Sequence, residues 1–140
     1  MNSTARKIVV GVDGSESSRH ALRWAARQAG LTGVELHAVQ AWDVPSAYGY
    51  VPTITVDWER EAGAELARTI KETLAHPGAL SVHAEVIRGH ATEVLMAEAE
   101  GAELLVVGSR GRGEFSGMVL GSVSQFLVTH ARCPVVVMRG

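Results

Sequence analysis

A cluster of glycines in the last third of the chain offers the clearest chemistry in the sequence. Five glycines lie between an apolar run that ends at Val107 and a helix-like run that begins at Ser122: Gly108, Gly111, Gly113, Gly117 and Gly121. Glycines let backbone N–H groups approach an anion without a Cβ in the way, and a helix start adds unpaired N–H donors and partial positive charge. The pattern therefore predicts a phosphate-binding loop between a buried strand and a helix.

Two common phosphate loops do not fit these residues. A Walker A loop needs Gly-Lys-Ser/Thr, and no lysine lies between Glu72 and Gly140. The dinucleotide fingerprint needs G-x-G-x-x-G after the first strand, whereas Gly111 and Gly113 are followed by Ser116 after a late strand. A flexible surface loop is the alternative interpretation. The buried strand before the loop and the capping-box spacing after it, from Ser122 to Gln125, favour the phosphate site.

The elements that must position this loop alternate along the chain. Continuous or alternating apolar runs predict strands at Lys7–Val12, Val34–Trp42, Leu80–Arg88, Leu104–Val107 and Cys133–Met138. Helical spacing of apolar residues, with Gly30 and Gly101 as stop signals, predicts helices at about Ser17–Ala29, Asp57–Ala75, Ala91–Ala99 and Ser122–His130. The stretch Asp43–Val56 contains Pro45, Gly49 and Pro52 and is expected to be a long loop.

This alternation predicts an α/β fold, a single domain over residues 1–140 with an open parallel five-stranded sheet and helices on both faces. The apolar first and fourth strands belong at the centre, and the alternating third strand belongs at an edge. The strand order is therefore expected to be 3-2-1-4-5. Ligands bind where such a sheet reverses direction, beyond the carboxyl ends of the strands. The turn at Asp13 and the loop at Gly108 flank that point.

Composition narrows the range of partners. The net charge is −2, which argues against a nucleic-acid partner or an anionic membrane surface. No apolar run approaches the roughly 20 residues of a membrane span, and Ile8–Val12 is too short for the core of a signal peptide. Cys133 is expected to be a buried thiol in a reducing compartment. We expect a cytoplasmic protein.

The remaining candidate residues leave several alternatives open. Asp13 could only terminate a strand or cap a helix, and Ser122 could be only an N-cap. Arg110 and Arg112 could be solvated charges or phosphate ligands. The six histidines lie in different elements without metal-ligand spacing, so no metal site is expected. Neither a serine triad, a nucleophilic cysteine nor a poised carboxylate pair is visible, so no catalytic residue is assigned.

Two segments make the whole chain resemble the nucleotide-binding universal stress proteins. The spacing Gly108-x2-Gly111-x9-Gly121-Ser122 matches their G-x2-G-x9-G-S/T signature, and Val9–Ser15, V-V-G-V-D-G-S, is similar to their first strand and turn. The resemblance implies an adenine nucleotide alpha-hydrolase-like fold that binds ATP with Mg²⁺. It assigns the site to Gly11, Val12, Asp13, Ala41, Gly108, Ser109, Arg110, Gly111, Arg112, Gly113, Gly121, Ser122 and Val123. Gly11 stands where family members often have proline, a difference that a backbone contact tolerates.

The last predicted strand adds an expectation about assembly. Val135–Met138 is apolar and carries no charge before Arg139, yet the predicted order puts it at a sheet edge, where proteins usually place charges. We therefore expect a homodimer through Cys133–Met138, as the resemblance also implies. Cover by the fourth helix and the chain end is the alternative.

Three functional hypotheses follow. The first is a homodimeric module that binds ATP and signals that state in a stress response. The second is a slow ATPase or self-phosphorylating enzyme, for which the loop supplies no clear base. The third is a nucleotide-independent interaction protein, against which the intact glycine spacing argues.

Overall fold

The computed structural model describes residues 6–44, 56–74, 81–111 and 120–140. Five strands alternate with four helices in this part of the chain. In chain order they are β1 (Lys7–Gly11), α1 (Glu16–Thr32), β2 (Glu35–Trp42), α2 (Trp58–Thr73), β3 (Val82–Arg88), α3 (Ala91–Glu98), β4 (Leu104–Gly108), α4 (Ser122–His130) and β5 (Val135–Met138). None of the described helices is both long enough and apolar enough to span a bilayer.

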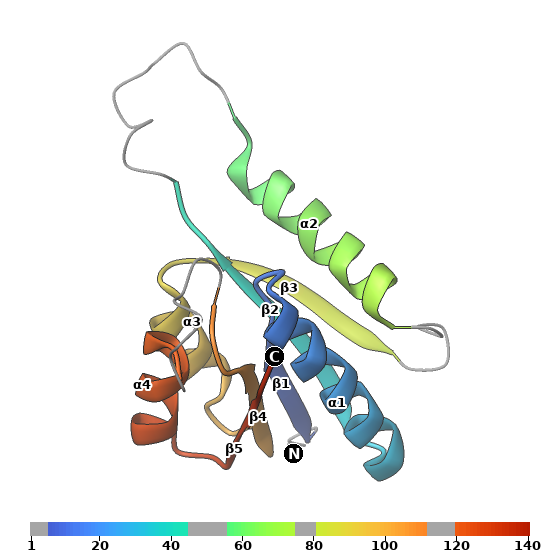
Figure 1. Cartoon of the computed structure of the whole chain (residues 1–140). Coiled ribbons are helices and arrows are strands. Elements are labelled where there is room, and N and C mark those ends of the chain that lie inside the picture. The colour runs from blue at the N-terminus through green and yellow to red at the C-terminus, as the bar shows by residue number, and fades with distance from the viewer. Residues whose placement is uncertain (1–5, 45–55, 75–80, 112–119) are drawn as a thin grey trace.

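The strands form one parallel sheet of order β3-β2-β1-β4-β5, which confirms the predicted order. Figure 1 shows the sheet between two layers of helices, with α1 and α2 on one face and α3 and α4 on the other. After β1 the chain adds β2 and β3 on one side of it, and it then crosses to add β4 and β5 on the other side, so the switch point lies between β1 and β4. The turn after β1 and the loop after β4 therefore leave the sheet side by side at its carboxyl edge.

Each face of the sheet has its own apolar core, because successive strand side chains point to opposite faces. Ile8 and Val10 of β1 pack under α1 and α2, whereas Val9 packs under α3 and α4. Three residues of the predicted α2 stripe, Leu66, Ile70 and Leu74, lie in the first core, and the fourth, Ala62, is also buried. The central strands β1 and β4 are thereby fixed on both faces, which makes their carboxyl ends rigid supports.

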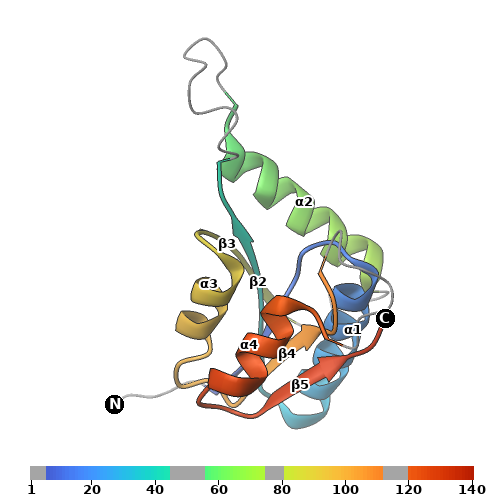
Figure 2. The same ribbon diagram turned by 60° about the vertical axis from the view of Figure 1, so that its left-hand side comes forward.

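The two edge strands differ in polarity. β3 exposes His83 and Glu85, while Val82 and Val86 pack against the first core. β5 lies at the opposite edge, next to α4 in the turned view of Figure 2. Its four residues Val135–Met138 are all half-buried. Cys133 and Pro134, which were predicted to belong to this strand, precede it.

Two predicted helix boundaries are wrong, the end of α1 and the start of α4. Gly30 is an exposed residue inside α1 rather than its C-cap. The helix ends at Thr32 because Gly33 adopts the left-handed conformation, at φ 71°, and donates its N–H to the Ala29 carbonyl. A glycine tolerates this conformation without steric cost.

The start of α4 is the second. Gly121, not Ser122, is the N-cap, and Ser122 is the first helical residue. The Gly121 carbonyl accepts the Gln125 N–H at 2.9 Å, so the predicted capping box from Ser122 to Gln125 does not form. The other predicted boundaries differ by a few residues at most; for example, β1 ends at Gly11, with Val12 just beyond it, and β2 begins at Glu35 instead of Val34.

Candidate functional site

A cleft opens at the carboxyl ends of β1 and β4, at the predicted switch point. Its lining comes from every strand in the middle of the sheet and from the starts of α1, α3 and α4. The residues are Gly11, Val12, Asp13, Ser18, Val39, Ala41, Ala91, Leu95, Val107, Gly108, Arg110, Gly111, Val123 and Ser124. The cleft therefore joins the turn after β1 to the first residues of the glycine loop.

Hydrogen bonds to serines shape the turn after β1. The Asp13 Oδ1 accepts the Ser15 N–H at 2.9 Å, and the Ser15 hydroxyl caps α1 by accepting the Ser18 N–H at 3.3 Å. The Ser18 hydroxyl lies 3.3 Å from the Asp13 N–H and 3.0 Å from the Ser15 carbonyl. Asp13 therefore helps to shape this turn, as one of the alternatives predicted, and it also lines the cleft.

The same turn is tied to the glycine loop. The Ser17 hydroxyl is buried and donates to the Arg110 carbonyl at 2.7 Å. Gly108 allows this close approach: a Cβ at Gly108 would lie 2.7 Å from the Ser17 carbonyl carbon and 2.8 Å from the Ser18 nitrogen. The strand end at Gly108 thus packs directly against the backbone of α1, so the two cleft walls hold each other in place.

The start of α4 forms a third wall. The Gly121 N–H donates to the Ser109 carbonyl at 2.5 Å, and the buried Ser124 hydroxyl donates to the same carbonyl at 2.9 Å. No side chain among the described residues caps α4. By contrast, Ser15, Asp57 and His90 cap the other three helices with their side chains. The first turn of a helix has N–H groups without intrahelical partners, and here they begin at the cleft.

The opposite side of the cleft is apolar. Val39, Leu95 and Val107 belong to the second core and reach the cleft at its edge. A Cβ at Gly11 would lie 2.8 Å from the Leu95 Cδ1 and 3.5 Å from the Val107 Cγ1. The missing side chain at Gly11 therefore lets the Leu95 side chain pack closely against β1 at the apolar wall of the cleft.

The predicted site residues fall into three groups. Those that line the cleft are Gly11, Val12, Asp13, Ala41, Gly108, Arg110, Gly111 and Val123. Ser109, Gly121 and Ser122 are not part of the lining that the described residues define, but Ser109 and Gly121 hold the loop to α4 through their hydrogen bond. Arg112 and Gly113 lie outside the described residues.

Sequence analysis missed six residues of the lining: Ser18, Val39, Ala91, Leu95, Val107 and Ser124. Ala91 could have been found, since it follows the turn at the carboxyl end of β3, on the same edge of the sheet as the glycine loop. Val39 shares a strand face with the predicted Ala41, because side chains alternate along a strand. Leu95 and Val107 carry no such signal, since their apolar pattern is that of ordinary core residues.

An open parallel sheet with a glycine-lined cleft at its switch point defines a class of α/β proteins that bind small ligands there. Residues 4–139 match the model of the universal stress protein family. The chain therefore belongs to the universal stress protein family.

Curated relatives support this assignment. A universal stress protein of Mycolicibacterium smegmatis is 40% identical over 136 residues, which cover 94% of this chain and 45% of the relative. Universal stress protein Rv2623 of Mycobacterium tuberculosis is 34% identical over 142 residues, which cover 93% of this chain and 46% of the relative. The chain thus spans about half the length of these relatives.

Solved structures share the fold. Universal stress protein UspA from Lactobacillus plantarum has a TM-score of 0.79 at 24% identity, covering 99% of this chain and 100% of that one. A universal stress protein in complex with cAMP has a TM-score of 0.71 at 24% identity, covering 96% and 98%. The universal stress protein from Archaeoglobus fulgidus in complex with dAMP has a TM-score of 0.65 at 23% identity, covering 95% and 97%.

Proposed function

We propose that this protein binds ATP, with Mg²⁺ bridging the phosphates, in the cleft at the switch point and that it works as a homodimeric stress-response module. The observation that carries the proposal is the junction of the glycine loop, the turn at Asp13 and the start of α4 around one cleft. The spacing of Gly108, Gly111, Gly121 and Ser122 matches the nucleotide-binding signature in full.

The apolar side of the cleft suits the base. Val39, Leu95 and Val107 offer apolar surface on which a purine could pack, and Gly11 beside them adds no side chain to the cleft wall. The backbone of Ala41, near the end of β2, would supply polar contacts to the edge of the base. Asp13 lies on the β1 side, within the cleft, where a ribose hydroxyl could donate to its carboxylate.

The glycine side suits the phosphates. The backbone of Gly108 to Gly111 carries no bulky side chain except that of Arg110, and the first turn of α4 adds N–H groups at Ser122 and Val123. Helix starts of this kind bind phosphate oxygens through backbone donors and the helix dipole. Magnesium binds to phosphates through few protein ligands, and a bound Mg²⁺ would neutralise their charge without further acidic residues.

Similarity to solved complexes supports an adenine nucleotide as the ligand class. Two structural neighbours were solved with cAMP and dAMP. Both ligands combine an adenine base with one phosphate group. The triphosphate is our extension of that class, based on the length of the glycine signature and on the α4 start.

Binding without rapid turnover is the expected behaviour. Among the described residues that line the cleft, Asp13 is the one carboxylate, and its Oδ1 already accepts the Ser15 N–H. General-base catalysis needs a group that can take a proton from the attacking water. The second hypothesis is an enzyme that slowly hydrolyses ATP or phosphorylates itself. The third is an interaction protein that works without a nucleotide.

Two measurements test the proposal. Denaturing the purified protein and identifying the released small molecules by mass spectrometry should give an adenine nucleotide. Titration calorimetry of nucleotide-free protein with ATP, ADP, AMP and cAMP, with and without Mg²⁺, should then rank the ligands, with Mg·ATP first. Absence of heat with all four at millimolar concentration would refute the proposal.

A further inference from the structure

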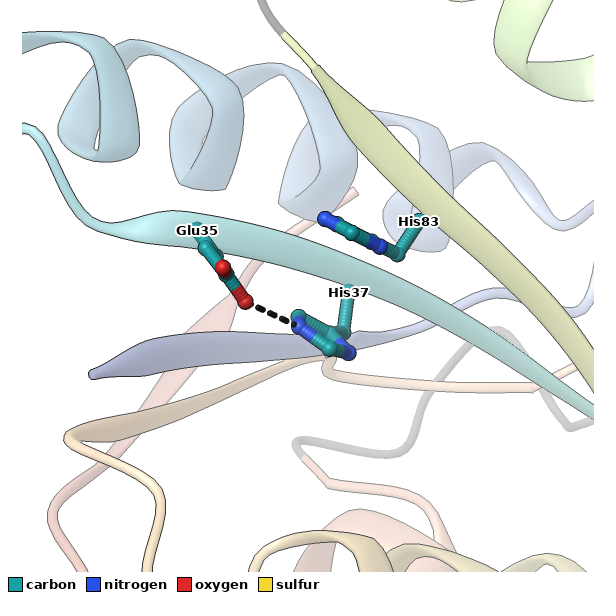
Figure 3. Close-up of side chains that lie close together, drawn as sticks. All are labelled: Glu35, His37 and His83. Carbon is teal, nitrogen blue, oxygen red and sulfur yellow. Dashed lines mark hydrogen bonds and ion pairs between the residues drawn. The ribbon is translucent and has the colours of Figure 1, made fainter. Parts of the chain in front are cut away.

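A second group of side chains with ligand chemistry lies at the other end of the sheet. Glu35 and His37 of β2 and His83 of β3 each offer one ligand atom, and these atoms all lie within 4.8 Å of one another. Figure 3 shows the carboxylate of Glu35 directed to the His37 ring, with the His83 ring beside it. We propose that Glu35, His37 and His83 form a binding site for a divalent transition-metal ion, with Zn²⁺ as the preferred ion.

The sheet brings the three residues together. His37 and His83 are partners in the parallel β2–β3 register, and Glu35 is two residues before His37 on the same strand. Because side chains alternate along a strand, residues two apart share a face, and partners on adjacent strands share it too. Sequence spacing alone gave no metal signal for these histidines, since the two imidazoles come from different strands.

The donor atoms match zinc better than the hard cations. Zinc sites combine imidazole nitrogens at about 2.0–2.1 Å with carboxylate oxygens at about 2.0–2.2 Å, and two histidines with one glutamate leave a position for water. Magnesium and calcium prefer oxygen ligands throughout. The two imidazoles therefore disfavour Mg²⁺, which is the cation that we expect on the phosphates of ATP.

The carboxylate is in its metal-binding form at neutral pH. An ordinary glutamate is ionised well below neutral pH, and the Glu35 Oε1 lies 3.0 Å from the His37 Nε2. Metal binding needs an ionised carboxylate and neutral imidazoles.

One ring must turn for both imidazoles to reach one ion. The His37 and His83 rings are stacked, with 4.6 Å between their centroids and 13° between their planes. The lone pairs of imidazole lie in the ring plane, so two nearly parallel rings cannot both point at a single metal. His83 is exposed on the edge strand and can rotate, whereas His37 is half-buried. A cross-strand pair that only stabilises the sheet is the competing explanation.

The site is separate from the cleft. Glu35 is the first residue of β2, at the amino end of the parallel strands, and the cleft lies at their carboxyl ends. A metal titration without nucleotide therefore tests this site alone, and its outcome does not depend on the proposed function.

The test uses the full chain without an affinity tag, treated with EDTA and dialysed. Titration calorimetry with zinc chloride at about pH 7.5, where ordinary imidazoles are mostly neutral, should give one Zn²⁺ per chain. His83→Ala and His37→Ala should each weaken binding at least tenfold. His20→Ala is the matched control, because His20 lies on α1, against the other face of the sheet; its affinity should equal that of the wild type.

Two further measurements keep the result clear if an alanine variant is unstable. Glu35→Gln keeps the size of the side chain and removes its charge, and it should also weaken Zn²⁺ binding. In the wild type, the ring nitrogens of His37 and His83 should shift in NMR spectra on addition of Zn²⁺. Equal affinity of the folded His83→Ala variant, or unchanged signals of both rings at saturating zinc, would show that the pair serves only the sheet.

Discussion

At the residue scale, a side chain added at Gly11 is expected to change the shape of the cleft without disturbing the sheet. A Cβ at this position would lie 2.8 Å from a terminal methyl of Leu95, which is the end of a flexible side chain. A small rotation of Leu95 would accommodate a larger residue without moving the backbone. A valine at position 11 should therefore leave the sheet intact while its methyl groups occupy the apolar side of the cleft.

The variant Gly11→Val should lower the affinity for ATP at least tenfold, or about 1.4 kcal/mol, because the base loses its space. Titration calorimetry measures the loss, and circular dichroism checks the fold. Gly30→Val is the control, since Gly30 is exposed on α1 with no atom within 4 Å of an added Cβ. Full affinity of the Gly11→Val protein would mean that the base binds elsewhere.

Cys133 provides a prediction about reactivity. Burial is the main cause that raises the pKa of the Cys133 thiol, and the charge of Glu100 adds to it. Since the thiolate is the nucleophile, a raised pKa leaves less of the reactive form at neutral pH. Modification of the native protein by a thiol reagent should be slower than that of the urea-unfolded chain and should accelerate as pH rises. Equal rates for the native and unfolded forms at neutral pH would contradict this.

The residue scale also shows where sequence reasoning stops. The glycine spacing and Asp13 could be identified in the sequence, because these residue types stand out from the apolar pattern of the strands that precede them. Leu95 and Val107 could not, because apolar residues at the edge of a cleft have the same spacing as apolar residues in a core. The proximity of Glu35, His37 and His83 depends on the register between β2 and β3. That register cannot be read from the sequence alone.

At the element scale, the packing of β4 against α1 constrains the glycine loop. An added Cβ at Gly108 would lie 2.7 Å from the carbonyl carbon of Ser17 and 2.8 Å from the backbone nitrogen of Ser18. Backbone atoms cannot rotate away as the Leu95 methyl can. The end of β4 or the start of α1 must therefore move, and the hydrogen bond from Ser17 to the Arg110 carbonyl is affected with it.

We expect Gly108→Ala to lower the free energy of unfolding by about 1–3 kcal/mol, the usual cost of overpacking. Urea denaturation measures it. Gly63→Ala in α2 is the control, because nothing lies within 4 Å of its added Cβ; replacing a helical glycine there should stabilise the protein by about 0.5–1 kcal/mol. A Gly108→Ala protein that is as stable as the wild type would show that β4 and α1 pack less closely than the structure indicates.

Strands and helix stripes were predictable from the sequence, but helix caps were less so. Strand order followed from polarity, since the continuous apolar runs of β1 and β4 fit only the centre of the sheet. Gly30 and Gly33 are both plausible ends of α1, and the choice depends on which glycine adopts the left-handed conformation. At α4, contacts of Gly121 and Ser124 with Ser109, far back in the loop, override the local capping pattern.

At the scale of the whole molecule, the edge strand β5 invites a partner. Its residues Val135–Met138 are half-buried and uncharged, whereas exposed sheet edges usually carry charge. The opposite edge strand, β3, contains His83, Glu85 and Arg88. We propose that a second copy of the chain pairs with β5 about a two-fold axis.

The hydrogen bonds of β5 identify the groups that such a partner would use. Pro134 and Met138 accept N–H groups of Leu105 and Ser109 through their carbonyls, at 3.0 and 2.7 Å. Backbone groups of successive strand residues point to alternate sides. Val136 therefore faces β4 with Pro134 and Met138, and Val135 and Val137 direct their N–H and C=O groups to the open edge.

Proline substitutions at Val136 and Val137 test the two hydrogen-bonding sides of β5 separately. Val137→Pro removes an N–H group that faces the open edge, a position where sheets tolerate proline, so the fold should persist while the dimer dissociates. Val136→Pro removes an N–H group that faces β4, so that variant should lose stability in urea. Sedimentation at tens of micromolar should show a dimeric wild type and a monomeric Val137→Pro protein. A monomeric wild type, or a Val137→Pro protein that stays dimeric, would show that β5 is not the interface.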